Sequence, residues 1–169
     1  MGRILTEELV KRALDFLGPS IEAMIKVKEA AFGPRFIFVG VDGPGLKEPV
    51  HGFFGDQSKV TSKLSDWDPK WGEYIHPTTF HGLAITKCKT ARRNGEPTSV
   101  TITLHPEKFE KGEYLYAGGV AEEKDGVAVG VSGLHGFVDE WIAWWVYHAI
   151  VTFCQQEAVD RIEADEKQI

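Results

Sequence analysis

The sequence predicts an α/β domain of the α+β type, in which an antiparallel sheet of about five strands is flanked by helices. Short β-branched runs at 36–41 and 99–104 have the length and composition of strands. A glycine- and valine-rich run at 116–133 contains an Asp-Gly pair, which favours a tight hairpin turn. Apolar residues recur at helical spacing near both ends of the chain. Since helices and strands do not alternate strictly, we do not expect a doubly wound parallel sheet.

The N-terminal segment predicts two helices. Thr6 can cap the first helix, and acidic residues in its first turn lie where the helix dipole favours negative charge. Gly18 and Pro19 interrupt the apolar pattern, so we expect the first helix to end there. A second helix should then cover about 21–31.

Two strands follow the helices. The run 36–41 is too short and too β-branched for a helix, so it indicates a buried strand, which ends at an Asp-Gly-Pro-Gly turn. Residues 50–54 are a plausible partner strand beyond that turn. Together they predict one edge of the sheet.

The segment 55–77 has no clean periodicity and contains several breakers of regular structure. We expect a long structured loop there, anchored by three aromatic residues, Trp67, Trp71 and Tyr74. Long loops in compact domains are often functional. A helix should begin at Thr78 or Thr79 and end near residue 93, before an Asn-Gly pair.

The last third of the chain predicts three strands and a long helix. Residues 99–104 alternate apolar and polar side chains in the manner of a strand. In the run 116–133, the turn should lie at 124–126, and the strand after it alternates valine with small residues, which permits close packing against its face. A helix should cover about 138–163, and the end of the chain at 155–169 is polar. The predicted order is αα-ββ-α-βββ-α.

Composition limits the function classes. The 169 residues suit a single domain, 1–169, and the net charge of −6 argues against a nucleic-acid partner. The longest apolar run, 141–147, is too short to span a membrane, so no membrane partner is expected. Cys88 and Cys154 lack CxxC spacing, which favours a reducing compartment and hence the cytoplasm. The sequence has neither a GxSxG elbow nor a dinucleotide-binding GxGxxG after a first strand.

His76 and His81 are the first candidate functional residues. With Glu73 nearby, two imidazoles and a carboxylate are enough for a metal site, a general base or a haem ligand. Their spacing is not that of a helical zinc site, because Pro77 separates them. The simpler alternative is a surface His76 and a His81 that satisfies hydrogen bonds in the core.

Anion-binding groups are the second set of candidates. Lys87 and Thr90 lie three residues apart on one helix, so they share a face and could bind a carboxylate or propionate. The segment 133–136, which contains Gly133 and His135, leads into the last helix, and its backbone amides could form an anion site. The alternative is that the Lys87 and Thr90 side chains are simply solvated.

The last helix carries an aromatic stripe. Trp141, Trp145 and His148 stand at i, i+4 and i+7, and the helix is apolar around most of its circumference. Such a helix is buried on more than one side, so we expect a homodimer or a larger homo-oligomer. The other interpretation is a wall of a cofactor pocket.

Three sequence blocks resemble the GlcG/HbpS-like family, which also forms the C-terminal domain of PduO-type proteins. The blocks are FVGVDGPG at 38–45, AITKCKTA at 84–91, and a glycine-rich pair, GGV at 118–120 and VGVSG at 129–133, followed by Asp-Glu at 139–140. The resemblance implies a profilin-like α/β domain with an antiparallel sheet between helices, assembled into oligomers. Some members of the family bind haem, and others are linked to cobalamin use. The chain departs from the family pattern at Ala121, where proline is usual, and its first helix carries no histidine.

The residues and the resemblance together give three hypotheses. The first is a small oligomeric protein that binds haem or a similar anionic small-molecule ligand. Its binding residues would be His76, His81, Lys87, Thr90, Gly119, Gly133 and His135. The second is a cofactor-independent enzyme acting on a small carboxylate or hydroxy-acid metabolite, with His81 as general base and either Lys87 or the backbone amides of 133–136 as anion clamp. The third is a structural or interaction subunit whose aromatic helix is entirely oligomer core.

Overall fold

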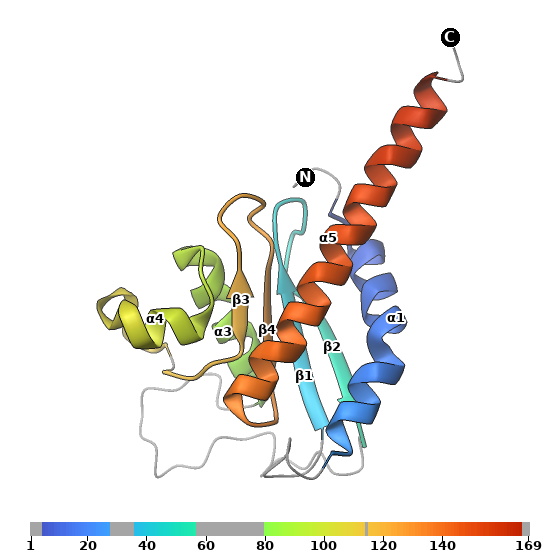
Figure 1. Cartoon of the computed structure of the whole chain (residues 1–169). Coiled ribbons are helices and arrows are strands. Elements are labelled where there is room, and N and C mark those ends of the chain that lie inside the picture. Colours follow the sequence, from blue (N-terminus) through green and yellow to red (C-terminus); the bar gives the residue numbers. More distant parts are fainter. Residues whose placement is uncertain (1–4, 28–35, 57–79, 114, 167–169) are drawn as a thin grey trace.

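The computed structural model describes residues 5–27, 36–56, 80–113 and 115–166, and these form one antiparallel sheet with helices on both faces (Figure 1). The described strands are β1 (Phe36–Asp42), β2 (Val50–Gly55), β3 (Gly119–Ala121) and β4 (Ala128–Ser132), in the order β2-β1-β4-β3. The helices are α1 (Glu7–Ile25), α3 (Phe80–Asn94), α4 (Thr98–Leu104) and α5 (Gly136–Glu166), with a 3-10 turn at Pro106–Lys108. Helices α1 and α5 pack together on one face of the sheet, and α3 covers the other.

The antiparallel sheet and the predicted hairpin are confirmed, but the count and order of the elements are not. The described part of the chain has four strands, and its order is α-ββ-αα-ββ-α. The hairpin turn lies where Asp-Gly predicted it, with Gly126 at φ +68°, a conformation that favours glycine. Helix α3 ends at Asn94, and Gly95 follows at φ +67° as a typical helix terminator. The expected loop at 55–77 and its helix caps lie outside the described residues, apart from Gly55 and Asp56.

The predicted strand at 99–104 was wrong, because this segment forms helix α4. The hydroxyl groups of Thr101 and Thr103 donate to carbonyl oxygens four residues earlier, which a helix permits. The buried residues are Thr98 and Thr101, which are spaced for a helix rather than a strand. The carboxylate of Glu140 accepts hydrogen bonds from the backbone N–H and the hydroxyl of Ser99, so a residue of α5 caps the start of α4.

The predicted break at Gly18-Pro19 was also wrong, since α1 continues through both residues. Proline clashes with the Cβ of the residue before it, and Gly18 has no Cβ to clash. Ile21 and Ile25 beyond the proline are buried, so packing holds the second half of the helix in line with the first. Thr6 caps this helix as predicted, because its hydroxyl oxygen accepts from the backbone N–H of Leu9 at 3.2 Å.

The two faces of the sheet are packed differently. The face under α1 and α5 carries the main apolar core, which includes Val39, Val41, Val129 and Val131. The face under α3 is lined over β4 and β3 by small residues, and a Cβ added at Gly130 would lie 2.0 Å from the carbonyl oxygen of Ala84. Helix α3 therefore lies in direct backbone contact with β4.

Helix α5 is 31 residues long, and its C-terminal part extends past the sheet and past α1 (Figure 1). Its first half packs on the sheet and on α1, where Ile142, Val146 and Ile150 are buried. Among the described residues, no helix combines the length and apolar character that crossing a membrane requires.

Candidate functional site

The described residues bring together one pair of imidazoles, His51 from β2 and His81 from α3. Nε2 of His81 and Nδ1 of His51 share a hydrogen bond, and the ring centroids lie 4.3 Å apart with the planes inclined by 33°. This bond uses one nitrogen of each ring, and the second nitrogen is not involved in it. The pair can therefore present an imidazole nitrogen to a further group.

The register of β1 and β2 explains how the two histidines meet. His51 pairs with Gly40 across the two strands, and paired residues of antiparallel strands point to the same face, here the face under α3. A Cβ at Gly40 would lie 2.5 Å from Cδ1 of Ile85, so the glycine lets α3 approach β1 closely. His81 lies one helical turn before Ile85 and thus reaches the neighbouring strand, β2.

Phenyl rings form a wall beside the pair. The ring of Phe38 lies 5.6 Å from the ring of His81 in an edge-on arrangement, and Phe53 lies 5.0 Å from Phe38. Phe36 and Phe80 extend the same cluster, with centroids 5.7 Å apart. Phe38 and Phe53 are partly exposed. The pair is therefore bordered by an apolar, aromatic surface on one side.

The electrostatics favour a neutral His81. Burial, and then the neighbouring charge of His51, lower the pKa of His81 below its ordinary value of 6.5. Its ring is half-buried, whereas His51 is exposed. At neutral pH, His81 is therefore an uncharged imidazole, which is the form that ligates a metal or accepts a proton.

The ammonium group of Lys87 is buried and bound to groups of the protein itself. Its side chain is only 4% exposed, and Nζ donates to Oδ2 of Asp139 at 3.1 Å and to the carbonyl oxygen of Val131 at 3.0 Å. A Cβ at Gly118 would lie 2.7 Å from Nζ, so the backbone closes over the ammonium group. Lys87 thus joins α3 to α5 at the end of β4, instead of facing a carboxylate from outside.

The expected anion site at the start of α5 holds a carboxylate of the protein itself. Oδ1 of Asp139 accepts from the backbone N–H of Leu134 at 2.9 Å. Burial raises the pKa of Asp139 to about 6, while Lys87 and the amides of Leu134 and Gly133 act in the opposite direction. The carbonyl of His135 accepts the backbone N–H groups of Val138 and Asp139. The imidazole of His135 is exposed.

The remaining predicted residues lie apart from the imidazole pair. Thr90 is nine residues after His81 and thus on the opposite side of α3. It is 1% exposed, and Oγ1 has no hydrogen-bond partner among the described residues. Gly119 and Gly133 are positions of close backbone packing, where a Cβ would lie 2.3 Å and 2.2 Å from the carbonyl oxygens of Lys87 and Phe36 respectively. His76 lies outside the described residues.

His51 is the site residue that the sequence interpretation missed. The sequence does place His51 in a predicted strand, and the paired residue, Gly40, leaves room for its side chain. This signal can be used only once the pairing of the two strands is known. The helix that carries His81 was predicted, but the hydrogen-bond partner of His81 lies thirty positions earlier in the chain. The site therefore depends on a tertiary contact.

The pair can be compared with the ligand numbers that metals take in proteins. Across residues 5–27, 36–56, 80–113 and 115–166, no three His, Cys, Asp or Glu side chains are placed to hold a metal together. A bare zinc ion takes three or four protein ligands, whereas haem iron has four ring nitrogens already and needs only one or two. An aromatic wall beside an imidazole also fits the flat, apolar face of a porphyrin.

No family model, no curated protein and no solved structure matches the chain.

Proposed function

We propose that this chain is a small-molecule-binding protein that holds haem or a similar planar, anionic ligand against the His51–His81 pair. The observation that carries the proposal is the His51–His81 pair with its neutral His81, which is partly open to solvent and bordered by Phe38 and Phe53. His81 or His51 would ligate the iron, and the phenyl rings would contact the flat face of the macrocycle. The resemblance to the GlcG/HbpS-like family, some members of which bind haem, supports the same ligand class.

The positive charge for the carboxylates of such a ligand has to come from outside the buried core. Lys87 is engaged with Asp139, and Arg92 pairs with Asp42 at 2.7 Å. Lys89 is exposed two turns beyond His81 on α3, about 12 Å along the helix at 1.5 Å per residue. Lys89 is therefore the described cation that we assign to a ligand carboxylate.

The experiment is a titration of the purified protein with haemin, followed by the Soret absorption band. The wild type should shift the band at a protein-to-haemin ratio near one, and His81→Ala should weaken binding by about tenfold or more. His105→Ala is the matched control, because His105 ends α4 and contacts neither imidazole of the pair. An unshifted band with the wild type, or equal binding by the His81 and His105 variants, would refute the proposal.

A second candidate function rests on the same pair. A neutral imidazole that is hydrogen-bonded to another imidazole can accept a proton and be held in one orientation while it does so, which is what a general base requires. The substrate class would be a small carboxylate or hydroxy acid. Exchange of the carbon-bound α-proton of 2-hydroxy acids in D₂O, followed by NMR, tests it: exchange that persists unchanged in His81→Ala would contradict this role.

We also propose that the chain associates with itself in the cytoplasm. Trp141 on α5 is 53% exposed, and Phe16 on the neighbouring helix α1 is 68% exposed. Large apolar side chains exposed on the surface of a helical layer indicate an interaction surface. Cys88 and Cys154 are buried free thiols, as is usual for proteins of a reducing compartment. Light scattering of the purified protein gives the assembled mass, and a mass of 18.8 kDa at all concentrations would exclude self-association.

A further inference from the structure

The outer stripe of α5 has the spacing of a helix-pairing surface. By outer stripe we mean the solvent-facing positions of α5 that follow one another in alternating steps of four and three residues. They are Trp141, Trp145, His148, Thr152, Gln155, Val159 and Ile162. Alternating three- and four-residue steps keep side chains on one side of a helix and are the spacing at which two helices pack with a crossing angle of about 20°. The stripe thus has helix-pairing geometry over most of α5.

The order of apolar and polar residues in the outer stripe is the same in both directions along the helix. Two large apolar residues come first, three polar residues lie in the middle, and two apolar residues come last. The terminal residues Val159 and Ile162 are 47% and 58% exposed and lie near the C-terminal end of α5. A surface with this symmetry is complementary to itself, as a two-fold interface between identical chains requires.

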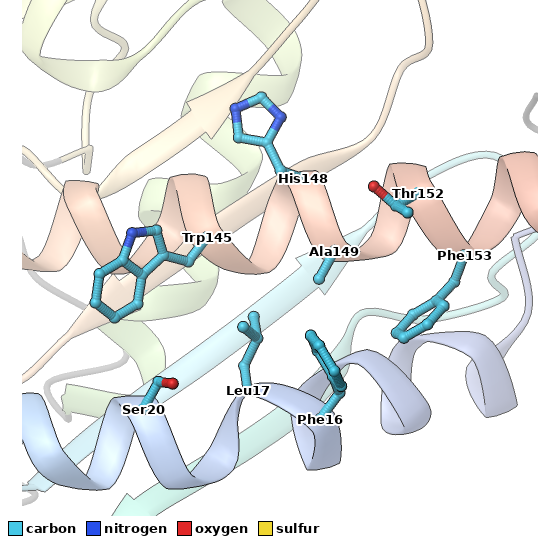
Figure 2. A pocket seen from close by; sticks show the side chains of 8 residues that line it. All are labelled: Phe16, Leu17, Ser20, Trp145, His148, Ala149, Thr152 and Phe153. Atoms are coloured by element: carbon cyan, nitrogen blue, oxygen red, sulfur yellow. The ribbon is translucent and has the colours of Figure 1, made fainter.

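A groove runs beside the first half of the outer stripe, between α1 and α5. It has a volume of about 500 Å³, and Figure 2 shows Phe16 and Leu17 of α1 opposite Ala149 and Phe153 of α5. Trp145 and Thr152 belong both to the groove and to the outer stripe. Apolar side chains from a second helix that lies on the stripe would therefore have a place to enter.

Volume and charge favour an antiparallel over a parallel arrangement of two such helices. Antiparallel helices set each tryptophan against a smaller Val or Ile, whereas parallel helices would set four tryptophans together at one end. Residues 157–166 contain five carboxylates and one arginine, and parallel packing would bring two such acidic ends together. Antiparallel packing also aligns the helix dipoles favourably.

The antiparallel arrangement brings the acidic end near a cation of the partner. Phe16 contacts Phe153, and Ser20 shares the groove with Trp145, so α1 runs antiparallel to α5 in each copy. Six residues further along α1, the exposed Lys26 lies near the level of the start of α5. The acidic C-terminal end of a partner helix would reach this level.

We propose that two copies of the chain pair through their α5 helices, antiparallel, about a two-fold axis near Thr152. Val159 of one copy then lies against Trp145 of the other, at the end of its groove, and Ile162 lies near the level of Trp141. This inference rests on the self-association proposed above and specifies its surface and direction.

The first test compares two single-charge variants by light scattering. Ile162→Glu puts a charge in the outer stripe, and Ala164→Glu puts the same charge on an exposed position at the far side of the same helix. We expect the wild type and Ala164→Glu to have at least twice the 18.8 kDa of the chain, and Ile162→Glu to lose half of the assembled mass or more. An assembly that Ile162→Glu leaves intact would overturn the pairing through α5, while self-association would stand.

The second test measures direction by cross-linking with a short bis-maleimide, since Cys88 and Cys154 are buried. Thr152→Cys lies near the proposed axis, so the two copies should cross-link. Ile162→Cys lies ten residues from the axis, so its two copies would be about 30 Å apart at 1.5 Å per residue and should not cross-link. Cross-linking at residue 162 as efficient as at 152 would indicate parallel helices and overturn the proposal. A wild-type monomer with no cross-link at either position would overturn self-association as well.

Discussion

The contact between α3 and β4 gives the most direct prediction from this structure, and Gly130→Ala is the change that probes it. A Cβ at this position would lie 2.0 Å from the carbonyl oxygen of Ala84 and 2.5 Å from the backbone nitrogen of Cys88. Both atoms belong to the helix backbone, so no side-chain rotation can relieve the overlap. An ordinary van der Waals contact begins at 3.4 Å, so α3 would have to move away from the sheet by about 1.4 Å.

Such a movement would disturb the whole interface between α3 and the sheet. Cys88 donates a hydrogen bond through Sγ to the carbonyl oxygen of Ala128 at 3.3 Å, and this bond would be stretched beyond its range. Overpacking of a well-packed core typically destabilises by about 1–3 kcal/mol. Because the clash is with backbone atoms, we expect the upper end, about 3 kcal/mol.

Urea denaturation with a matched glycine control measures this effect. At a slope of about 2 kcal/mol per molar, the midpoint of Gly130→Ala should fall by about 1.5 M. Gly18→Ala should instead stay within about 1 kcal/mol of the wild type, because the added Cβ would meet Phe54 at an ordinary 3.6 Å and the helix propensity that alanine gains offsets its crowding against the ring of Pro19. A Gly130→Ala variant within about 0.5 kcal/mol of the wild type would refute the close approach of α3.

Three further predictions concern buried polar groups. Lys87→Met should lower the free energy of unfolding by about 3–5 kcal/mol, because Asp139 loses its buried counter-charge. Adding Asp139→Leu to this variant should restore much of the loss, and a double variant as unstable in urea as Lys87→Met alone would contradict this. Tyr147→Phe should lose about 1–2 kcal/mol, because Asp125 loses a buried hydroxyl donor, and a midpoint equal to that of the wild type would show that the bond contributes nothing. Because the pKa of His81 is lowered in the folded state, the unfolded state takes up a proton at about pH 6.5 and the folded state only at lower pH. Acidification below about pH 6.5 should therefore destabilise the wild type more than His81→Gln. Equal losses of unfolding free energy by the two proteins between about pH 7 and pH 5.5 would contradict this prediction.

The sequence predicts secondary structure correctly where the local signals agree with the tertiary packing. The run at 36–41 and the Asp-Gly turn at 125–126 each specify their element within a few residues, and both elements are present. The failures come where a distant residue decides the outcome. Segment 99–104 alternates like a strand, yet the carboxylate of Glu140, about forty residues away, caps its first turn as a helix.

The candidate site shows the same division. The sequence singled out His81 correctly as a residue on α3, but not His51, because only strand register brings them together. Lys87 was predicted either to bind the anionic group of a ligand or to be solvated, and its actual partner, Asp139, lies 52 positions further along the chain. A lysine on a helix face does not by itself indicate whether its ammonium group is solvated, bound to a ligand or paired in the core.

The measurement that most directly tests the proposed ligand site is NMR of the imidazole ring protons during titration with haemin. Ferric haem iron is paramagnetic and broadens the signals of nuclei near it, and histidine variants assign each signal to its residue. The signals of His51 and His81 should broaden first, while those of His105, which follows α4, and of His148 in α5, on the opposite side of the sheet, should remain sharp. Broadening of His105 or His148 before the pair, or no broadening of any imidazole at saturating haemin, would contradict the proposed site.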